Sequence, residues 1–311
     1  MRHRLVGITS VRFALVAVVL GVLFAAASSP PVPEDGSGWI HLEDLRRIAG
    51  AEGLPDEVGV VSIGHNRAPA HLMTGGISFG LLDLGLYSYE VRWSDRTGLI
   101  DVGNDEATQQ EFFPWSSFDT EGWEVLQEAL RRASFVVITH EHFDHVTGLF
   151  ASPWFDEVAP NVRLTPAQLS SPQMQEAKMT DDHRARLTPW EADGPTRLTN
   201  GVVVIPAPGH TPGSQLVFVR LSSGQELLFA GDVVWNKVSM DLPRLKPRWV
   251  SWALGEDTAA IGRQVAGLRS LQQQGVHVIV AHDVDQHAHL LRDGLMVDMR
   301  GASLDQAPAD R

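Results

Sequence analysis

Residues 139–145 read Thr-His-Glu-His-Phe-Asp-His, and this stretch does most to indicate the fold and the chemistry of the chain. The residues before it, 133–139, are mostly apolar and rich in β-branched side chains, which predicts a buried strand. The histidines therefore follow a strand end, where a loop can direct several side chains to one point. Neutral imidazoles and carboxylates are ligands that Zn²⁺ and related cations prefer. Three histidines and one aspartate within six positions therefore predict a metal site.

The composition is that of a globular protein with ample material for a core. The chain has 311 residues, of which 43% are apolar and 20% are charged. It contains no cysteine, which excludes disulfides, cysteine-based zinc sites and thiol catalysis. Any metal must therefore be held by histidines and carboxylates. The net charge of −13 disfavours nucleic acids as partners, because phosphates are bound by basic patches.

The first 27 residues differ from the rest of the chain. They contain three of the 25 basic residues and none of the 38 acidic ones, and residues 13–27 are apolar throughout. About 15 uncharged residues are fewer than the roughly 20 that a membrane span needs. Residues 1–27 are therefore predicted to be a cleaved signal peptide, with an uncleaved signal anchor through residues 5–27 as the alternative. Either interpretation predicts export to the periplasm or the medium, and membrane contact only through such an anchor.

The remainder is expected to form one domain after a short linker. Residues 28–38 are rich in Pro, Gly and Ser and read as the linker, and residues 39–311 read as the domain. The predicted strands and helices of the domain form two groups along the chain. Each group ends with a helix followed by a strand, and this order predicts an α/β fold. The expected strands are 58–63, 87–93, 97–102, 135–139, 161–164, 202–206, 215–221, 226–230 and 276–280, and the expected helices are 42–51, 121–132 and 256–274.

Four further ligand-type residues lie at the end of a predicted strand or just after one. They are Asp101, His210, Asp232 and His282. In layered α/β folds, sites assemble at strand ends. Glycines beside His210 and Asp232 suit tight turns that present the neighbouring side chain. Taken singly, each of these residues is most simply structural, but together with 139–145 they supply enough donors for two metal ions.

These motifs, in this order, resemble those of the metallo-β-lactamase-fold hydrolase superfamily. The resemblance rests on residues 140–145, the Pro-Gly-His-Thr block at 208–211, Gly231-Asp232 and His282, and it extends over roughly residues 55–285. It implies a four-layer αβ/βα sandwich with a dinuclear site at one edge of the two sheets. The first implied metal has the ligands His140, His142 and His210. The second has Asp144, His145 and His282, and Asp232 bridges the two.

The resemblance also implies a mechanism. Two divalent ions, zinc in the first place with iron or manganese as alternatives, share a water and lower its pKa. The bridging hydroxide attacks the carbonyl of a small-molecule substrate. Asp144 is expected to orient it and to relay its proton. Asp101 belongs to an early Asp-x-Gly motif that lies near such sites and is usually structural, and Asp283 is a candidate acceptor for a ligand imidazole.

Enzymes of this superfamily catalyse different reactions, and several features of this sequence narrow the choice among those reactions. The third metallo-β-lactamase subclass has a similar histidine run but lacks the bridging aspartate that Asp232 supplies. Glyoxalase II-like thioesterases carry a C-terminal helical domain, whereas only 29 residues follow His282. Lactonase-like enzymes keep the whole ligand set, so we expect a hydrolase of a small ester or lactone. A β-lactamase, a thioesterase and a mononuclear iron oxygenase acting on a sulfur substrate remain the alternatives.

The sequence also predicts the surroundings of some residues outside these motifs. Lactonases often place a tyrosine after the bridging aspartate, whereas this chain has Trp235 in that region. Trp235 and the aromatic residues at 112–118 are candidates to line the pocket, with core packing as the alternative. His287 and His289 lie in a polar stretch and are expected to be solvated.

Overall fold

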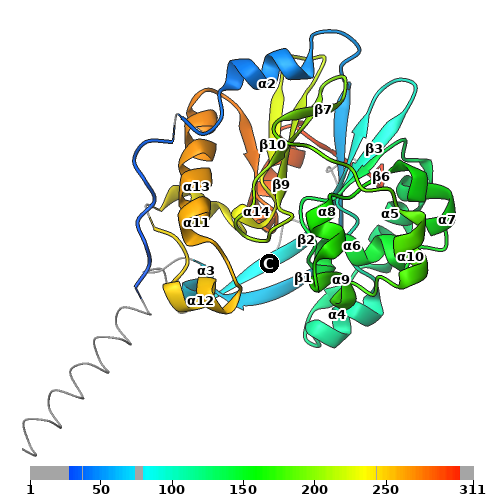
Figure 1. Cartoon of the computed structure of the whole chain (residues 1–311), viewed down its shortest axis with the longest axis horizontal. Coiled ribbons are helices and arrows are strands. Elements are labelled where there is room, and N and C mark those ends of the chain that lie inside the picture. Colours follow the sequence, from blue (N-terminus) through cyan, green and yellow to red (C-terminus); the bar gives the residue numbers. More distant parts are fainter. Residues whose placement is uncertain (1–27, 37, 74–79, 243, 302–311) are drawn as a thin grey trace, which may run out of the picture.

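A computed structural model describes residues 28–301 except 37, 74–79 and 243, and in it two β-sheets pack face to face between outer layers of helices (Figure 1). The seven-stranded sheet has the order β12-β1-β2-β3-β5-β6, with β4 paired to β1, and the five-stranded sheet has the order β11-β10-β9-β8-β7. Strands of the first sheet are β1 (Glu57–Pro69), β2 (Leu81–Arg92), β3 (Thr97–Ile100), β4 (Ser117–Phe118), β5 (Val136–Val137), β6 (Val162–Arg163) and β12 (Val297–Asp298). Strands of the second are β7 (Thr196–Thr199), β8 (Val202–Pro206), β9 (Gln215–Arg220), β10 (Glu226–Phe229) and β11 (His277–Ile279).

Helices cover both outer faces of the pair of sheets. Two of them, α2 (Leu42–Ala49) and α13 (Thr258–Gln273), pack on the second sheet, and α5 (Thr120–Arg132), α6 (Phe143–Phe150) and α7 (Phe155–Val158) pack on the first. Further helices fill the connections. They are α3 (Ala70–Met73), α4 (Glu106–Phe112), α8 (Pro166–Ser170), α9 (Gln173–Glu176), α10 (Asp181–Arg186), α11 (Lys237–Asp241), α12 (Arg248–Ala253) and α14 (Val284–Arg292).

The apolar run in β8 shows why the sheets lie in the middle of the molecule. Successive side chains of a strand point to opposite faces. Val202 and Val204 belong to the cluster between the two sheets, whereas Val203 and Ile205 belong to the cluster under α2 and α13. A strand that is buried on both faces reads as a continuous apolar run rather than an alternating one. A third apolar cluster lies between the first sheet and α5 to α7, so three cores separate four layers.

The structure confirms the expected α/β fold and most of its expected elements. The main differences lie where polar residues interrupt the apolar pattern. The first two strands are longer than the expected 58–63 and 87–93, and β1 and β2 pair from Glu57↔Arg92 to Pro69↔Leu81, past the exposed His65. Residues 103–120, for which no helix or strand was expected, contain α4, whose N-cap Asp105 accepts with its side chain from the backbone N–H of Thr108. Residues 165–200, which carried little signal, form α8 to α10 and β7.

The predicted linker is partly packed onto the domain. Val32 is buried in the core under α13, and the carbonyl of Pro30 accepts a hydrogen bond from the backbone N–H of Leu245 at 2.9 Å. The predicted signal segment, residues 1–27, lies outside the described residues. None of the helices in the described part of the chain is long and apolar enough to cross a membrane.

Gly148 holds α6 close to the first sheet, and its replacement tests this packing. A Cβ atom there would lie 1.9 Å from the carbonyl oxygen of Val102. We expect Gly148→Ala to lower the free energy of unfolding by about 1–3 kcal/mol, since the helix must move outward. Urea titration measures this loss. Gly194→Ala is the control, because its Cβ would meet nothing within 4 Å, and equal midpoints for both variants would contradict the prediction.

Candidate metal centre

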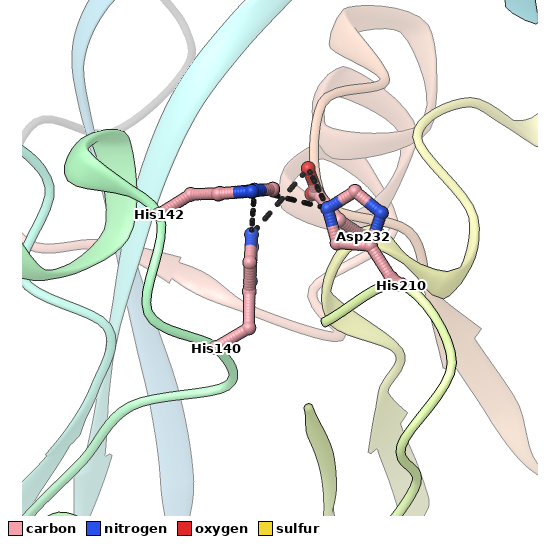
Figure 2. A group of neighbouring side chains, drawn as sticks. All are labelled: His140, His142, His210 and Asp232. Atoms are coloured by element: carbon pink, nitrogen blue, oxygen red, sulfur yellow. Dashed lines mark hydrogen bonds and ion pairs between the residues drawn. The ribbon is translucent and has the colours of Figure 1, made fainter. Parts of the chain in front are cut away.

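Loops at the ends of four strands bring the predicted ligands together. The loop after β5 carries His140 and His142 and leads into the first turn of α6, which supplies Asp144 and His145. The segments after β8, β10 and β11 supply His210, Asp232 and His282. Figure 2 shows His140, His142, His210 and Asp232 pointing toward one another from these different segments.

The donor atoms form two groups, in each of which all atoms lie within 4.8 Å of one another. The first group consists of His140, His142, His210 and Asp232, and the second consists of Asp144, His145 and His282. In the first group, His142 Nδ1 lies 3.0 Å from Nε2 of both His140 and His210. In the second, Asp144 Oδ2 lies 3.8 Å from Nε2 of His282 and 3.9 Å from Nε2 of His145. The division between the groups is the one that the sequence resemblance implied.

Asp232 faces both groups with different oxygen atoms. Its Oδ2 lies 3.4 Å from Nε2 of His210 and 3.6 Å from Nε2 of His140. Its Oδ1 lies 3.0 Å from Nε2 of His282 and 3.4 Å from Nε2 of His145. A carboxylate in this position can place one oxygen on each of two cations.

The outer nitrogen of each imidazole already has a partner, which fixes the orientation of the ring. Asp101 Oδ2 lies 2.8 Å from Nδ1 of His145, and Glu256 Oε1 lies 2.8 Å from Nδ1 of His210. The carbonyl of Gly85 lies 2.9 Å from Nδ1 of His282. The two remaining contacts are those of His142 Nε2 with the carboxamide of Gln173, at 2.9 Å, and of His140 Nδ1 with the hydroxyl of Thr139, at 3.3 Å.

The inner atoms fit a metal better than they fit one another. His145 Nε2 and Asp232 Oδ1 are buried and make no hydrogen bond within the described part of the chain. Buried polar atoms are normally satisfied, so each such atom needs an explanation. Nitrogen and carboxylate donors that converge at this spacing form the donor set that divalent first-row metals prefer. The cluster is therefore suited to two cations.

The charges of the cluster also favour cations. Burial opposes a charge on Asp232, but His282, His140 and His145 outweigh it and hold the pKa of Asp232 well below its usual value. Burial likewise opposes a proton on His145, but Asp101 and Asp144 raise the pKa of this imidazole well above its usual value. Burial lowers the pKa of His142 to about 4. The carboxylates therefore draw protons onto part of the cluster, and a bound cation would displace them.

Asp101 supports the site directly, although the sequence placed it only nearby. Its φ is 57°, a left-handed value that is uncommon outside glycine. One carboxylate oxygen accepts from the backbone N–H of Thr139 at 2.6 Å, and the other accepts from the Thr139 hydroxyl at 2.7 Å. The same carboxylate thus holds the start of the histidine run and the imidazole of His145.

Two sequence expectations in this region were wrong. Asp283 does not accept from a ligand imidazole; it caps α14 by accepting from the N–H of Gln286 and also accepts from the N–H of Lys237. His287 is not solvated but 1% exposed, because α14 turns it inward, where its ring stacks on Tyr87. Its Nε2 lies 2.7 Å from the Tyr89 hydroxyl.

Glu256, the partner of His210, was not predicted from the sequence. Its side chain is 0% exposed and also pairs with Lys246, whose ammonium lies 4.0 Å from the centre of the Trp235 ring. Burial opposes its charge, but Lys246 and His210 outweigh that effect and hold the pKa of Glu256 at about 2. Glu256 lies on a loop, and no local pattern distinguishes it from the other acidic residues of the chain.

Replacing Glu256 tests its role in orienting His210. Glu256→Gln keeps the shape but removes the charge that holds the Nδ1 proton. We expect metal affinity to fall by about 10- to 100-fold, measured by competition with a chromophoric chelator. Glu226→Gln is the matched control, because Glu226 is a buried carboxylate at the other end of β10 that pairs with Arg46. Equal affinity losses in both variants would contradict the prediction.

A largely apolar cavity of about 370 Å³ opens beside the two groups. Its polar wall includes His142, Asp144, Asp232 and His282. Its apolar wall includes Leu84, Leu86, Phe113, Phe143, Trp235 and Leu254. Trp235 and one of the aromatic residues at 112–118 thus line the pocket as expected. Phe112 instead stacks on Phe143 behind it, and Trp115 is 72% exposed.

Comparisons with known proteins show similarity to one superfamily. The profile of the metallo-beta-lactamase superfamily matches residues 84–281. The Homo sapiens protein named acyl-coenzyme A thioesterase MBLAC2 is 28% identical over 171 residues, which are 49% of this chain and 59% of that protein. The chain therefore spans little more than half of this relative.

Solved structures share the fold at lower identity. An N-acyl homoserine lactone hydrolase with N-hexanoyl-L-homoserine bound at its catalytic metal centre aligns with a TM-score of 0.57 at 17% identity, over 76% of this chain and 96% of that one. A dizinc quorum-quenching lactonase aligns with a TM-score of 0.52 at 14% identity, over 75% and 92% of the two chains. At these identities the likeness shows the fold alone.

Proposed function

Because the chain belongs to the metallo-beta-lactamase superfamily, we propose that it holds two divalent cations and hydrolyses a small ester or lactone. The observation that carries this proposal is the position of Asp232. Its two oxygens face the two groups of donors separately, which is the arrangement that a shared pair of cations requires. Zinc is the first expectation, because imidazole and carboxylate donors suit it.

The chain's own residues would divide the remaining work. Two cations bound in this cluster would lower the pKa of a shared water toward about 7 and so supply a nucleophile near neutral pH. Asp144 is the most exposed carboxylate of the cluster, at 14%, and lines the cavity, so it is placed to accept a proton and to pass it to the leaving group. The apolar wall excludes water and would hold the apolar part of the substrate.

An ester or a lactone suits this cavity better than a charged substrate. The cavity wall is mostly apolar, and the chain has a net charge of −13, which disfavours polyanionic phosphodiesters. The lactonases named above share the fold over most of this chain. A thioester is the second candidate, because the human relative is named as an acyl-coenzyme A thioesterase. We further propose that the protein acts outside the cytoplasm, on the basis of the basic and apolar residues 1–27.

A substrate panel tests the proposal. The zinc-loaded protein is assayed with an N-acyl lactone, an acyl thioester, a β-lactam and a phosphodiester. We expect the kcat/KM for the lactone to exceed those for the β-lactam and the phosphodiester by at least about 100-fold, a difference of about 2.7 kcal/mol in activation free energy. A thioester preference would favour the second candidate. Oxygen uptake by an iron-loaded preparation that does not hydrolyse the panel would overturn the proposal.

A further inference from the structure

The helix α12 exposes two tryptophans on the surface. Trp249 is 46% exposed and Trp252 is 83% exposed, whereas Val250 and Ser251 between them are buried and attach the helix to the domain. Large aromatic side chains are seldom this exposed on a protein that stays in water. Within the described residues the other exposed large apolar side chains are Leu81, Trp115 and Val238. Two exposed tryptophans on one six-residue helix therefore need an explanation.

The described chain begins directly beside this helix. The carbonyl of Ser28 accepts a hydrogen bond from the backbone N–H of Arg248, the first residue of α12, at 3.0 Å. Two residues later, the carbonyl of Pro30 accepts from Leu245, and Pro31 forms a bridge with Arg244. In Figure 1 the blue chain runs down to the end of the molecule where α12 lies. The segment that precedes Ser28 must therefore join the domain at α12.

That preceding segment is the apolar stretch 13–27. Tryptophans favour the boundary between lipid and water, where the ring is buried and the indole N–H can hydrogen-bond, and arginines favour the same boundary. Arg244 and Arg248 are exposed beside the tryptophans, and no acidic residue occurs from 242 to 255. We propose that residues 1–27 are retained as the signal anchor and that the exposed face of α12 contacts the lipid bilayer that residues 13–27 enter.

A second copy of the chain is a poorer occupant for this face. A tryptophan buries roughly 150–250 Å² of surface, so two of them supply about 500 Å² at most. A stable interface needs about 800 Å² on each partner. Contact with a bilayer does not require this much buried area on α12, because the apolar segment itself would supply most of the attachment. The tryptophans would then set the orientation of the domain on the membrane.

The absence of cysteine makes a direct test possible, because a single introduced cysteine can be labelled without interference. W252C and W249C are made in the full chain and labelled with a nitroxide, and each protein is reconstituted into phosphatidylcholine vesicles. W115C is the matched control, since Trp115 is 72% exposed but lies on the loop between α4 and β4. Collision rates are measured with oxygen, which dissolves in lipid, and with a water-soluble nickel complex.

We expect the labels at 249 and 252 to collide more often with oxygen and several-fold less often with nickel than the label at 115. Equal nickel collisions at 252 and 115 would overturn the proposal. Dipolar broadening at 252 that disappears when unlabelled chain is added would show that a second copy covers α12, and this result would also overturn it. The labels at 249 and 252 report independently, so a defect in one variant leaves the test intact.

Discussion

Asp232→Ala is expected to retain one equivalent of metal instead of two and to lose at least about a thousandfold in kcat/KM, which corresponds to about 4 kcal/mol of transition-state stabilisation. The reason is geometric. Oδ1 of Asp232 faces His145 and His282, and Oδ2 faces His140 and His210. Its removal leaves the second group with a single carboxylate, from Asp144. Elemental analysis and steady-state kinetics on the same preparation measure the two losses.

The fold is expected to survive this substitution, because Asp232 belongs to none of the apolar clusters of the core. Circular dichroism checks that point. Asp293→Ala is the control, since Asp293 is an exposed carboxylate that pairs only with its neighbour Arg292 among the described residues. Two full equivalents of metal in folded Asp232→Ala would refute the bridging role of Asp232.

Removal of the metals is expected to cost the protein much of its stability. A ligand that binds only the folded state at 1,000 times its Kd adds about 4.1 kcal/mol, so two independent sites add about 8 kcal/mol. Urea unfolding with and without a chelator measures the difference. Titration of zinc into the apoprotein should restore its free energy of unfolding, and the increase should stop after two equivalents.

The Asp232→Ala variant provides the comparison for this experiment. It should regain stability only up to one equivalent of zinc. An apoprotein with the same unfolding midpoint as the zinc-loaded protein would mean that the cluster does not bind zinc in the folded state.

The sequence was sufficient for nine strands and for the side chains that follow them, whereas β4, β7 and β12 were not predicted. Residues such as His210 and Asp232 stand directly after apolar runs, so the strand pattern itself predicts where they meet. The partners of the imidazoles were harder to predict. Glu256 comes from a loop 46 residues after His210, and Gly85 contributes a carbonyl, which no side-chain pattern reveals. His287 was misjudged because the short helix α14 turns a residue from a polar stretch into the core.

The seven converging side chains come from both halves of the molecule. His140, His142, Asp144 and His145 follow a strand of the first sheet, whereas His210, Asp232 and His282 follow strands of the second. The two halves meet in the chain between Leu187 and Thr196. A chain divided there would yield two fragments, each with an incomplete set of donors. Their reassembly would depend on the free zinc concentration, so the same architecture could serve as a split reporter for zinc.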